Sequence, residues 1–191
     1  MKIRHPAEVV AVVVVVVLVA AGTAAAQAGT SHPGYYPIEN MGVLAKGDLE
    51  VDIDLTGAML QVAAGAMQSE NGEDEDLAKL VAGLERIRVQ VGAPQGADAT
   101  TIAHSFDSAI STMEGAGWSR ILRVVDEGEQ VYLFARENAG RIAGLTALIN
   151  DENEEIVLVN LVGDIDPVVL GKVIAKADRL PDLEQFMAGG N

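Results

Sequence analysis

The chain has 191 residues, of which 49% are hydrophobic, and its formal net charge is −15 at pH 7. A chain this acidic repels phosphate backbones and anionic lipid surfaces, and no cluster of Lys and Arg overcomes that repulsion, so we expect no nucleic-acid partner. The chain has no cysteine, which excludes disulfides, thiol nucleophiles, thiolate metal sites and a lipid-modified cysteine.

The N-terminus has the three parts of a secretory signal peptide. Lys2, Arg4 and His5 form a short basic start, residues 9–21 form an unbroken apolar run, and alanines supply the small side chains before a cut. We predict that residues 1–26 are removed by cleavage after Ala26 or, alternatively, after Ala28. The mature protein is then periplasmic or secreted, with a net charge of about −16.

The alternative for this segment is an uncleaved anchor in the inner membrane. Residues 9–26 approach the length of about 17–25 residues that crosses a bilayer. In this case the protein contacts the membrane through its N-terminal segment.

Residues 27–47 are a lead-in that contains Gly, Pro and Tyr and has weak periodicity. We expect residues 34–37 to be extended, because a residue before proline is pushed out of the helical region. The first regular element follows at residues 49–55, where apolar and acidic side chains alternate as in a strand. A helix over about 57–68 comes next.

An acidic connector over residues 69–76 leads into a second helix, which carries Leu77, Leu80, Val81 and Leu84 at helical spacing. The next strand places Ile87, Val89 and Val91 inward and Arg86, Arg88 and Gln90 outward. If this strand neighbours the first one, its arginines can form cross-strand ion pairs with Asp52 and Asp54.

Asp98 caps a third helix, which ends near residues 115–117. Four strands then follow in succession, and their short Gly, Asn and Asp connections favour an antiparallel meander. We place these strands at about 118–125, 130–136, 141–149 and 155–162. Asp166 and Pro167 begin a last helix, which runs to about residue 177.

This order of elements predicts a single α+β domain over residues 48–180, preceded by the signal peptide 1–26 and the lead-in 27–47 and followed by a tail over 181–191. The fold class we predict is a largely antiparallel sheet of about six strands with helices packed mainly on one face.

Strands 130–136 and 155–162 are apolar on both sides. Such strands are buried on both faces or present an apolar surface to another molecule. In the first interpretation, the lead-in or a terminal helix folds across the second face. In the second, these strands contact a protein partner or form a homodimer.

Candidate catalytic residues are few. His104, Ser105, Asp107 and Ser108 have the residue types of a hydrolase triad, but they fall on one helix, whereas triads usually bring partners together from separate segments. We therefore interpret them as a solvated helix face. Residues 140–144 lie at a turn and a strand rather than at a helix entrance, so they are not a phosphate-binding loop.

Metal sites also find little support. The mature chain has only His32 and His104, which excludes a histidine-rich zinc site. Asp52 and Asp54 resemble the start of a calcium loop, but its twelfth position is Ala63 rather than a glutamate. The acidic runs at 73–76 and 151–155 are solvated turns or weak calcium sites, and residues 163–166 are a strand exit with a helix cap. We predict no catalytic, cofactor-binding or metal-ligating residues and no cofactor.

The mature chain resembles the bacterial family described only as domain of unknown function 4252 (DUF4252). The resemblance covers nearly all of the mature chain, and its segments lie at residues 33–35, 49–55, 84–89, 117–120, 141–146 and 159–167. It implies a small exported bacterial protein, sometimes lipid-anchored through a cysteine that this chain lacks. It implies no activity, cofactor or catalytic residue.

We therefore expect an exported protein of the bacterial envelope that acts as a non-enzymatic partner-binding or accessory module. The alternatives are an enzyme, such as a hydrolase of unknown substrate, and a weak calcium-binding structural protein.

Overall fold

A computed structural model describes residues 31–69, 75–94, 96, 98–126, 128–151 and 155–177. The predicted signal peptide, the tail over 181–191 and the first half of the acidic run at 73–76 lie outside these residues, as does the middle of the run at 151–155. The domain boundaries stay a prediction.

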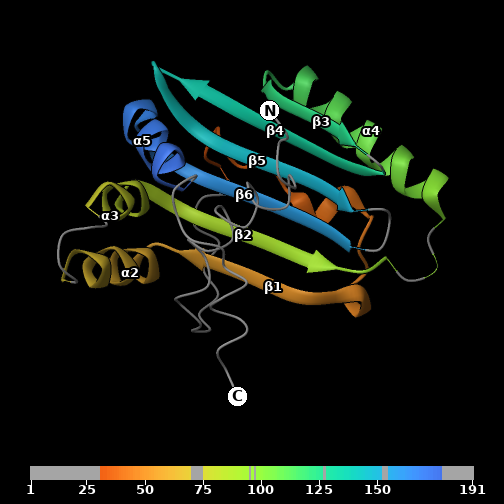
Figure 1. The fold of residues 1–191 in the computed structure, drawn as a ribbon, viewed down its shortest axis with the longest axis horizontal. Coiled ribbons are helices and arrows are strands. Elements are labelled where there is room, and N and C mark those ends of the chain that lie inside the picture. The colour runs from red at the N-terminus through yellow and green to blue at the C-terminus, as the bar shows by residue number, and fades with distance from the viewer. Residues whose placement is uncertain are drawn as a thin grey trace.

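Six strands form one sheet, in the order β1-β2-β6-β5-β4-β3 (Figure 1). Every neighbouring pair is antiparallel. The strands are β1 (Leu49–Thr56), β2 (Leu84–Gly92), β3 (Ser119–Asp126), β4 (Glu129–Asn138), β5 (Arg141–Asp151) and β6 (Glu155–Ile165). Both the predicted fold class and the antiparallel meander of the last four strands are confirmed. The last strand in the sequence, β6, lies inside the sheet between β2 and β5. The two edges of the sheet are therefore β1 and β3.

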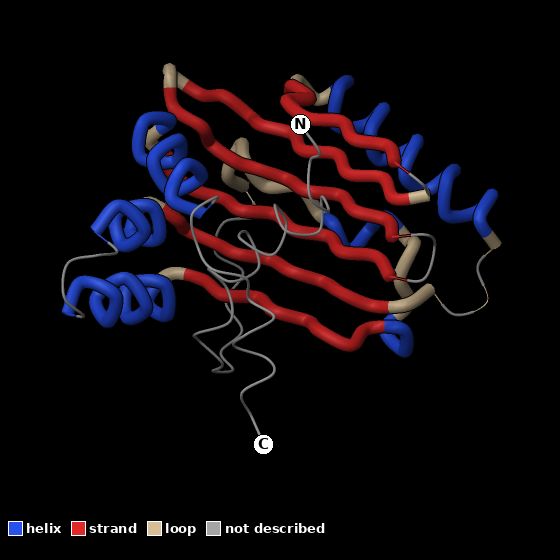
Figure 2. Tube along the Cα trace, in the orientation of Figure 1, coloured by secondary structure: helices blue, strands red, loops and turns tan. Residues whose placement is uncertain are grey.

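The described residues form four α-helices, α2 (Ala58–Ser69), α3 (Glu75–Ala82), α4 (Ala99–Gly115) and α5 (Pro167–Ala177), and two 3₁₀ helices, η1 (Ile38–Met41) and η2 (Lys46–Asp48). Figure 2 shows these helical segments in blue around the red sheet. Local sequence explains where they begin: Asp98 accepts a hydrogen bond of 2.7 Å from the Thr101 N–H, which caps α4 as predicted.

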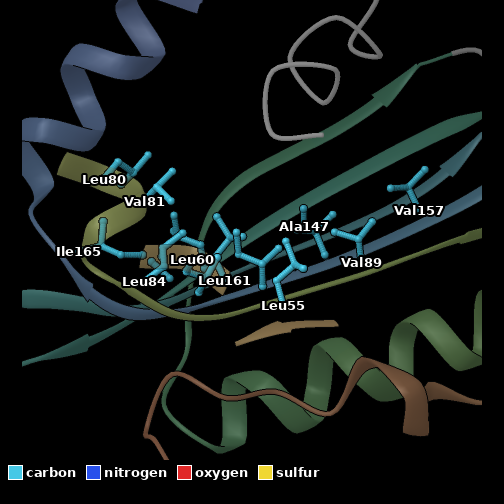
Figure 3. Close-up of a cluster of buried hydrophobic side chains, with 14 of the residues drawn as sticks. Leu55, Leu60, Leu80, Val81, Leu84, Val89, Ala147, Val157, Leu161 and Ile165 are labelled. Atoms are coloured by element: carbon cyan, nitrogen blue, oxygen red, sulfur yellow. The ribbon is translucent and has the colours of Figure 1, made fainter. Parts of the chain in front are cut away.

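Successive residues of a strand point to opposite faces of the sheet. One side, which we call the three-helix face, carries Leu55, Val89, Val159 and Leu161, and α2, α3 and α5 add apolar side chains to this cluster. Figure 1 shows these three helices gathered at one end of the sheet. Figure 3 shows the cluster continuing along the strands to Val157, well beyond the helices.

The opposite side, which we call the lead-in face, is covered by α4 and by the lead-in residues described here. Its strands bring Tyr132, Phe134, Ile156 and Leu158 into one buried cluster with side chains from both segments. Those lead-in and α4 side chains are Tyr36, Ile38, Val43, Ile102, Phe106, Ala109 and Met113. The interpretation in which the lead-in folds across the second face is therefore confirmed.

The three side chains of β2 that we predicted to point outward lie on the opposite face from Ile87 and Val89, as predicted, but they are not exposed to solvent. Arg86, Arg88 and Gln90 do face away from the three-helix face, but they are only 7%, 9% and 6% exposed. The reason is that this side of the sheet is not open to solvent, because the lead-in packs across it.

Candidate functional site

A buried asparagine in the middle of β6 fastens the lead-in to the sheet. Asn160 is fully buried, and its Oδ1 accepts a hydrogen bond of 3.1 Å from the Tyr36 N–H. Its Nδ2, which has two N–H donors, lies within hydrogen-bond distance of three acceptors, the Gly34 carbonyl at 3.1 Å, the Leu145 carbonyl at 3.2 Å and the Thr146 Oγ1 at 2.9 Å. Every polar atom of this amide thus has a partner, which makes its burial favourable.

Two glycines allow the lead-in to lie directly against the sheet. A Cβ on Gly34 would overlap the Ala143 carbonyl, and a Cβ on Gly144 would overlap the Gly34 backbone. Backbone atoms cannot move aside as a flexible side chain can, so both positions require glycine.

A charged cluster lies beside this contact, where the lead-in crosses β2. Arg86 donates two hydrogen bonds of 2.8 Å to Asp54, and its guanidinium lies 5.0 Å from the centre of the Tyr35 ring. The Tyr35 hydroxyl donates to Glu39 at 2.6 Å. Burial, together with this hydrogen bond, raises the pKa of Tyr35 to about 12. The hydrogen bonds to Asp54 raise the pKa of Arg86, so the arginine stays charged.

The predicted cross-strand ion pairs between β1 and β2 are confirmed. Arg86 pairs with Asp54, and Arg88 pairs with Asp52 and also donates to the Ile53 carbonyl at 2.9 Å. Both pairs are diagonal, because Asp54 lies opposite Arg88 and Asp52 lies opposite Gln90. The two aspartates that resemble the start of a calcium loop are therefore engaged by arginines.

An open cleft of about 700 Å³ lies where α2, α3 and α5 meet the strand ends. Its basic side chains are Arg141, which pairs with Asp164 and Asp166, and Lys79, whose Nζ lies 2.6 Å from Glu75. Both cations are thus neutralised by carboxylates. Nothing in this arrangement selects an anionic ligand.

The predicted helix cap borders the same cleft. Asp166 Oδ1 accepts hydrogen bonds from the Val168 N–H at 2.8 Å and the Val169 N–H at 3.3 Å. These bonds, with a smaller contribution from Arg141, lower the pKa of Asp166. Residues 163–166 thus form a strand exit and a helix cap, as predicted, and residues 140–144 form a turn and the start of β5.

The residues with triad chemistry lie together on α4 and face solvent. His104, Asp107 and Ser108 are exposed and Ser105 is half-buried, while the buried stripe of the helix points to the sheet. The interpretation as a solvated helix face is confirmed. His32, the other histidine of the predicted mature chain, accepts a hydrogen bond from the Gly34 N–H through its Nδ1.

Over the described part of the chain, His, Asp and Glu side chains nowhere gather in a group of three that could hold a metal ion. Glu75 pairs with Lys79, and Asp76 lies 3.7 Å from Lys172. No α-helix within the described ranges has the length and hydropathy needed to cross a bilayer.

The candidate binding surface is the part of the three-helix face that the described helices leave uncovered. We call it the open sheet surface and define it by five half-buried apolar side chains. They are Ile53, Val91, Leu122, Val124 and Leu133. The alternation of apolar residues predicted β1 and β2, and the short Gly, Asn and Asp connections predicted β3 and β4. The order of the strands, which brings β3 and β1 to the edges, has no local signal in the sequence.

A family model described as "Domain of unknown function (DUF4252)" matches residues 46–173. This range covers the whole sheet, α2 to α4 and most of α5. No curated protein and no solved structure matches the chain.

Proposed function

Because the chain belongs to the DUF4252 family, a domain family of unknown function, we propose its function from its geometry. We propose an exported, non-enzymatic module of the bacterial envelope that binds a protein partner through the open sheet surface.

The observation that supports this proposal is the uneven cover of the sheet. α2, α3 and α5 lie over one end of the three-helix face, and its apolar side chains continue along the strands (Figure 3). Val89 and Val157 are buried there, so the accessible part of this face is limited to the half-buried side chains of the open sheet surface. Leu133, in the strand predicted at 130–136, is half-buried on this surface, and so are Leu122 and Val124 next to it. Apolar side chains that stay partly accessible on a sheet favour contact with another protein.

Charge indicates the kind of partner. The chain carries a net charge of −15, although Asp52 and Asp54 of β1 pair with arginines on the lead-in face and do not border the open sheet surface. A chain with this net charge attracts basic molecules and repels acidic ones. We therefore propose a partner with an apolar segment flanked by Lys or Arg.

The compartment rests on residues 1–26, whose pattern is that of a signal peptide. The intact mass of the protein recovered from cells tests it. We expect a chain that starts at Gln27 or Gly29. A soluble chain that still begins with Met1 would overturn export.

Site-specific photo-cross-linking in intact cells tests the partner. A photo-reactive side chain at Leu133 should give a covalent adduct with another protein, identified by its mass. The matched control is the same probe at Val62, which is 67% exposed on α2, and here we expect no adduct. If the two positions give the same products, or if neither gives any, the open sheet surface is not the binding site.

A further inference from the structure

The two edges of the sheet carry complementary features. β1 and β3 each have eight residues, and Figure 1 shows them at opposite margins. Since all six strands alternate in direction, β1 and β3 run in opposite directions. A second copy can therefore place its β1 antiparallel to β3 of the first while both faces of the sheet continue unbroken.

Both edges also expose apolar side chains. Val51 on β1 is 36% exposed, and Ile121 and Val125 on β3 are 55% and 51% exposed. A row of unpaired backbone groups with exposed apolar residues is a template for pairing with another strand.

Two copies of the chain can pair through their edges in three ways, β1 with β1, β3 with β3 or β1 with β3. The charges on the edges favour the last of these. β1 carries Glu50, Asp52 and Asp54, of which the two aspartates also pair with Arg88 and Arg86 of β2. β3 carries the exposed Arg123 and Arg120, the latter 3.7 Å from Glu114, and a single acid, Asp126, at its end. Two copies of β1 would bring acids together, and two copies of β3 would bring arginines together. Only the pairing of β1 with β3 places opposite charges on one face, and like charges across a strand pair are destabilising.

We propose that β3 of one copy pairs antiparallel with β1 of a second copy, so that the chain assembles head to tail into a continuous sheet. The register that places Arg123 opposite Asp52 also places Val124 opposite Val51 and Leu122 opposite Ile53. The charged pair then lies on the lead-in face, because Arg123 neighbours Tyr132 and Asp52 neighbours Gln90. The two apolar pairs lie on the three-helix face.

A head-to-tail contact does not close on itself, so it leads to species larger than a dimer. The net charge of −15 on every copy opposes assembly, so we expect it at high protein concentration. This inference shares Ile53, Leu122 and Val124 with the open sheet surface, but it does not use Leu133, which lies on the inner strand β4. Cross-linking at Leu133 can therefore succeed while the chain stays monomeric. In the same way, the chain can assemble head to tail while Leu133 gives no adduct with another protein.

Sedimentation of the protein as recovered from cells, over a range of concentrations, tests the inference. We expect the average mass to rise beyond that of a dimer. Arg123→Glu places an acid against the acidic edge, and Val51→Lys places a charge within an apolar pair. Each variant should need an about tenfold higher concentration to assemble, which corresponds to 1.4 kcal/mol.

A mixture of the two variants is the decisive sample, because each keeps one intact edge. Arg123→Glu retains a normal β1, and Val51→Lys retains a normal β3. We expect the mixture to form a dimer of one copy of each and nothing larger. Val168→Lys, at a position 68% exposed on α5, is the control and should assemble as the wild type does. A wild type that stays monomeric at every concentration, or a mixture without the mixed dimer, would overturn the inference.

Discussion

Asn160 and Tyr36 are joined by a hydrogen bond of 3.1 Å although 124 residues separate them in the chain. This bond ties a segment that precedes the first strand to the last strand of the sheet. The same amide also donates to the Gly34 carbonyl at 3.1 Å. One side chain of β6 therefore binds the backbone of the lead-in at two residues, Gly34 and Tyr36. The cover over the lead-in face therefore depends on a polar residue within an apolar strand.

Replacing Asn160 by leucine should detach the lead-in. Leucine has the same shape but leaves the Tyr36 N–H and the Gly34 carbonyl without partners. Each buried group left unpaired costs about 1–3 kcal/mol. We expect the free energy of unfolding, measured in urea, to fall by about 2–4 kcal/mol.

The fluorescence of Trp118, the single tryptophan, reports on the same event. Trp118 is 6% exposed and its ring centre lies 6.3 Å from that of Tyr36, so its emission should shift to the red in Asn160→Leu. Thr146→Val is the control, since Asn160 keeps its other acceptors, and it should cost only about 1 kcal/mol. Equal losses for the two variants would contradict the role of Asn160 as the anchor.

Alanine should have opposite effects at two glycines. Gly144→Ala drives a Cβ into the Gly34 backbone, so it should destabilise the protein and shift the Trp118 emission. At Gly65, in the exposed part of α2, a Cβ meets no atom within 4 Å. Gly65→Ala should therefore stabilise the protein by about 0.5–1 kcal/mol, the usual gain of alanine over glycine in a helix. Thermal unfolding of both variants gives the comparison, and a stable Gly144→Ala would contradict the close approach.

Exchanging the charges of Asp52 and Arg88 should reveal their coupling. Arg88→Asp places a carboxylate beside Asp52 at a position that is 9% exposed, and we expect it to lower the free energy of unfolding by about 1.5–3 kcal/mol. Asp52→Arg should also destabilise, because it sets two cations side by side. The double variant should recover at least half of the summed loss.

The control for this exchange is Glu50→Arg. Glu50 is exposed on β1 and has no ion pair with the residues that the structure describes, so reversing its charge should change the free energy of unfolding by no more than about 0.5 kcal/mol. If the double variant is as unstable as the sum of its single changes, the two side chains do not stabilise the register of β1 and β2.

The elements of this fold could be predicted because their signals are local. The alternation of apolar and acidic side chains over residues 49–55 predicts β1, because successive side chains of a strand point to opposite faces and only one face is buried. Asp98 and Asp166 predict the starts of α4 and α5 because a side-chain oxygen can bind the free N–H groups there.

That the lead-in folds across the second face is one of two interpretations of the sequence, but the contacts that hold it there could not be predicted, because they join distant segments. Arg86 and Arg88 alternate with apolar residues, as solvent-facing residues of a strand do, yet the lead-in buries them. Asn160, a polar residue inside the apolar run at 156–162, was the available signal for a buried contact on that face. Its partner Gly34 lies 126 residues away, and nothing in either local sequence identifies the other.

The helix cap of α5 should make stability sensitive to acid. Hydrogen bonds from the Val168 and Val169 N–H groups lower the pKa of Asp166 below its ordinary value of 3.8. A carboxyl whose folded pKa is lowered stabilises the protein above its unfolded pKa, and this stabilisation is lost as the pH falls through the folded value. Asp166→Asn keeps a capping oxygen but cannot titrate, so its melting temperature should fall less steeply than that of the wild type as the pH drops below about 4.

Asp107→Asn is the matched control for this measurement. It removes one carboxyl of the same kind from α4, where Asp107 is exposed and no hydrogen bond of its side chain is seen among the described residues. The melting temperature of Asp107→Asn should follow that of the wild type through the same acid range. If Asp166→Asn and Asp107→Asn give the same curves, the carboxylate of Asp166 stabilises the fold no more than an exposed charge does, and α5 is held in place by its packing of Val169, Leu170 and Val173 against the core.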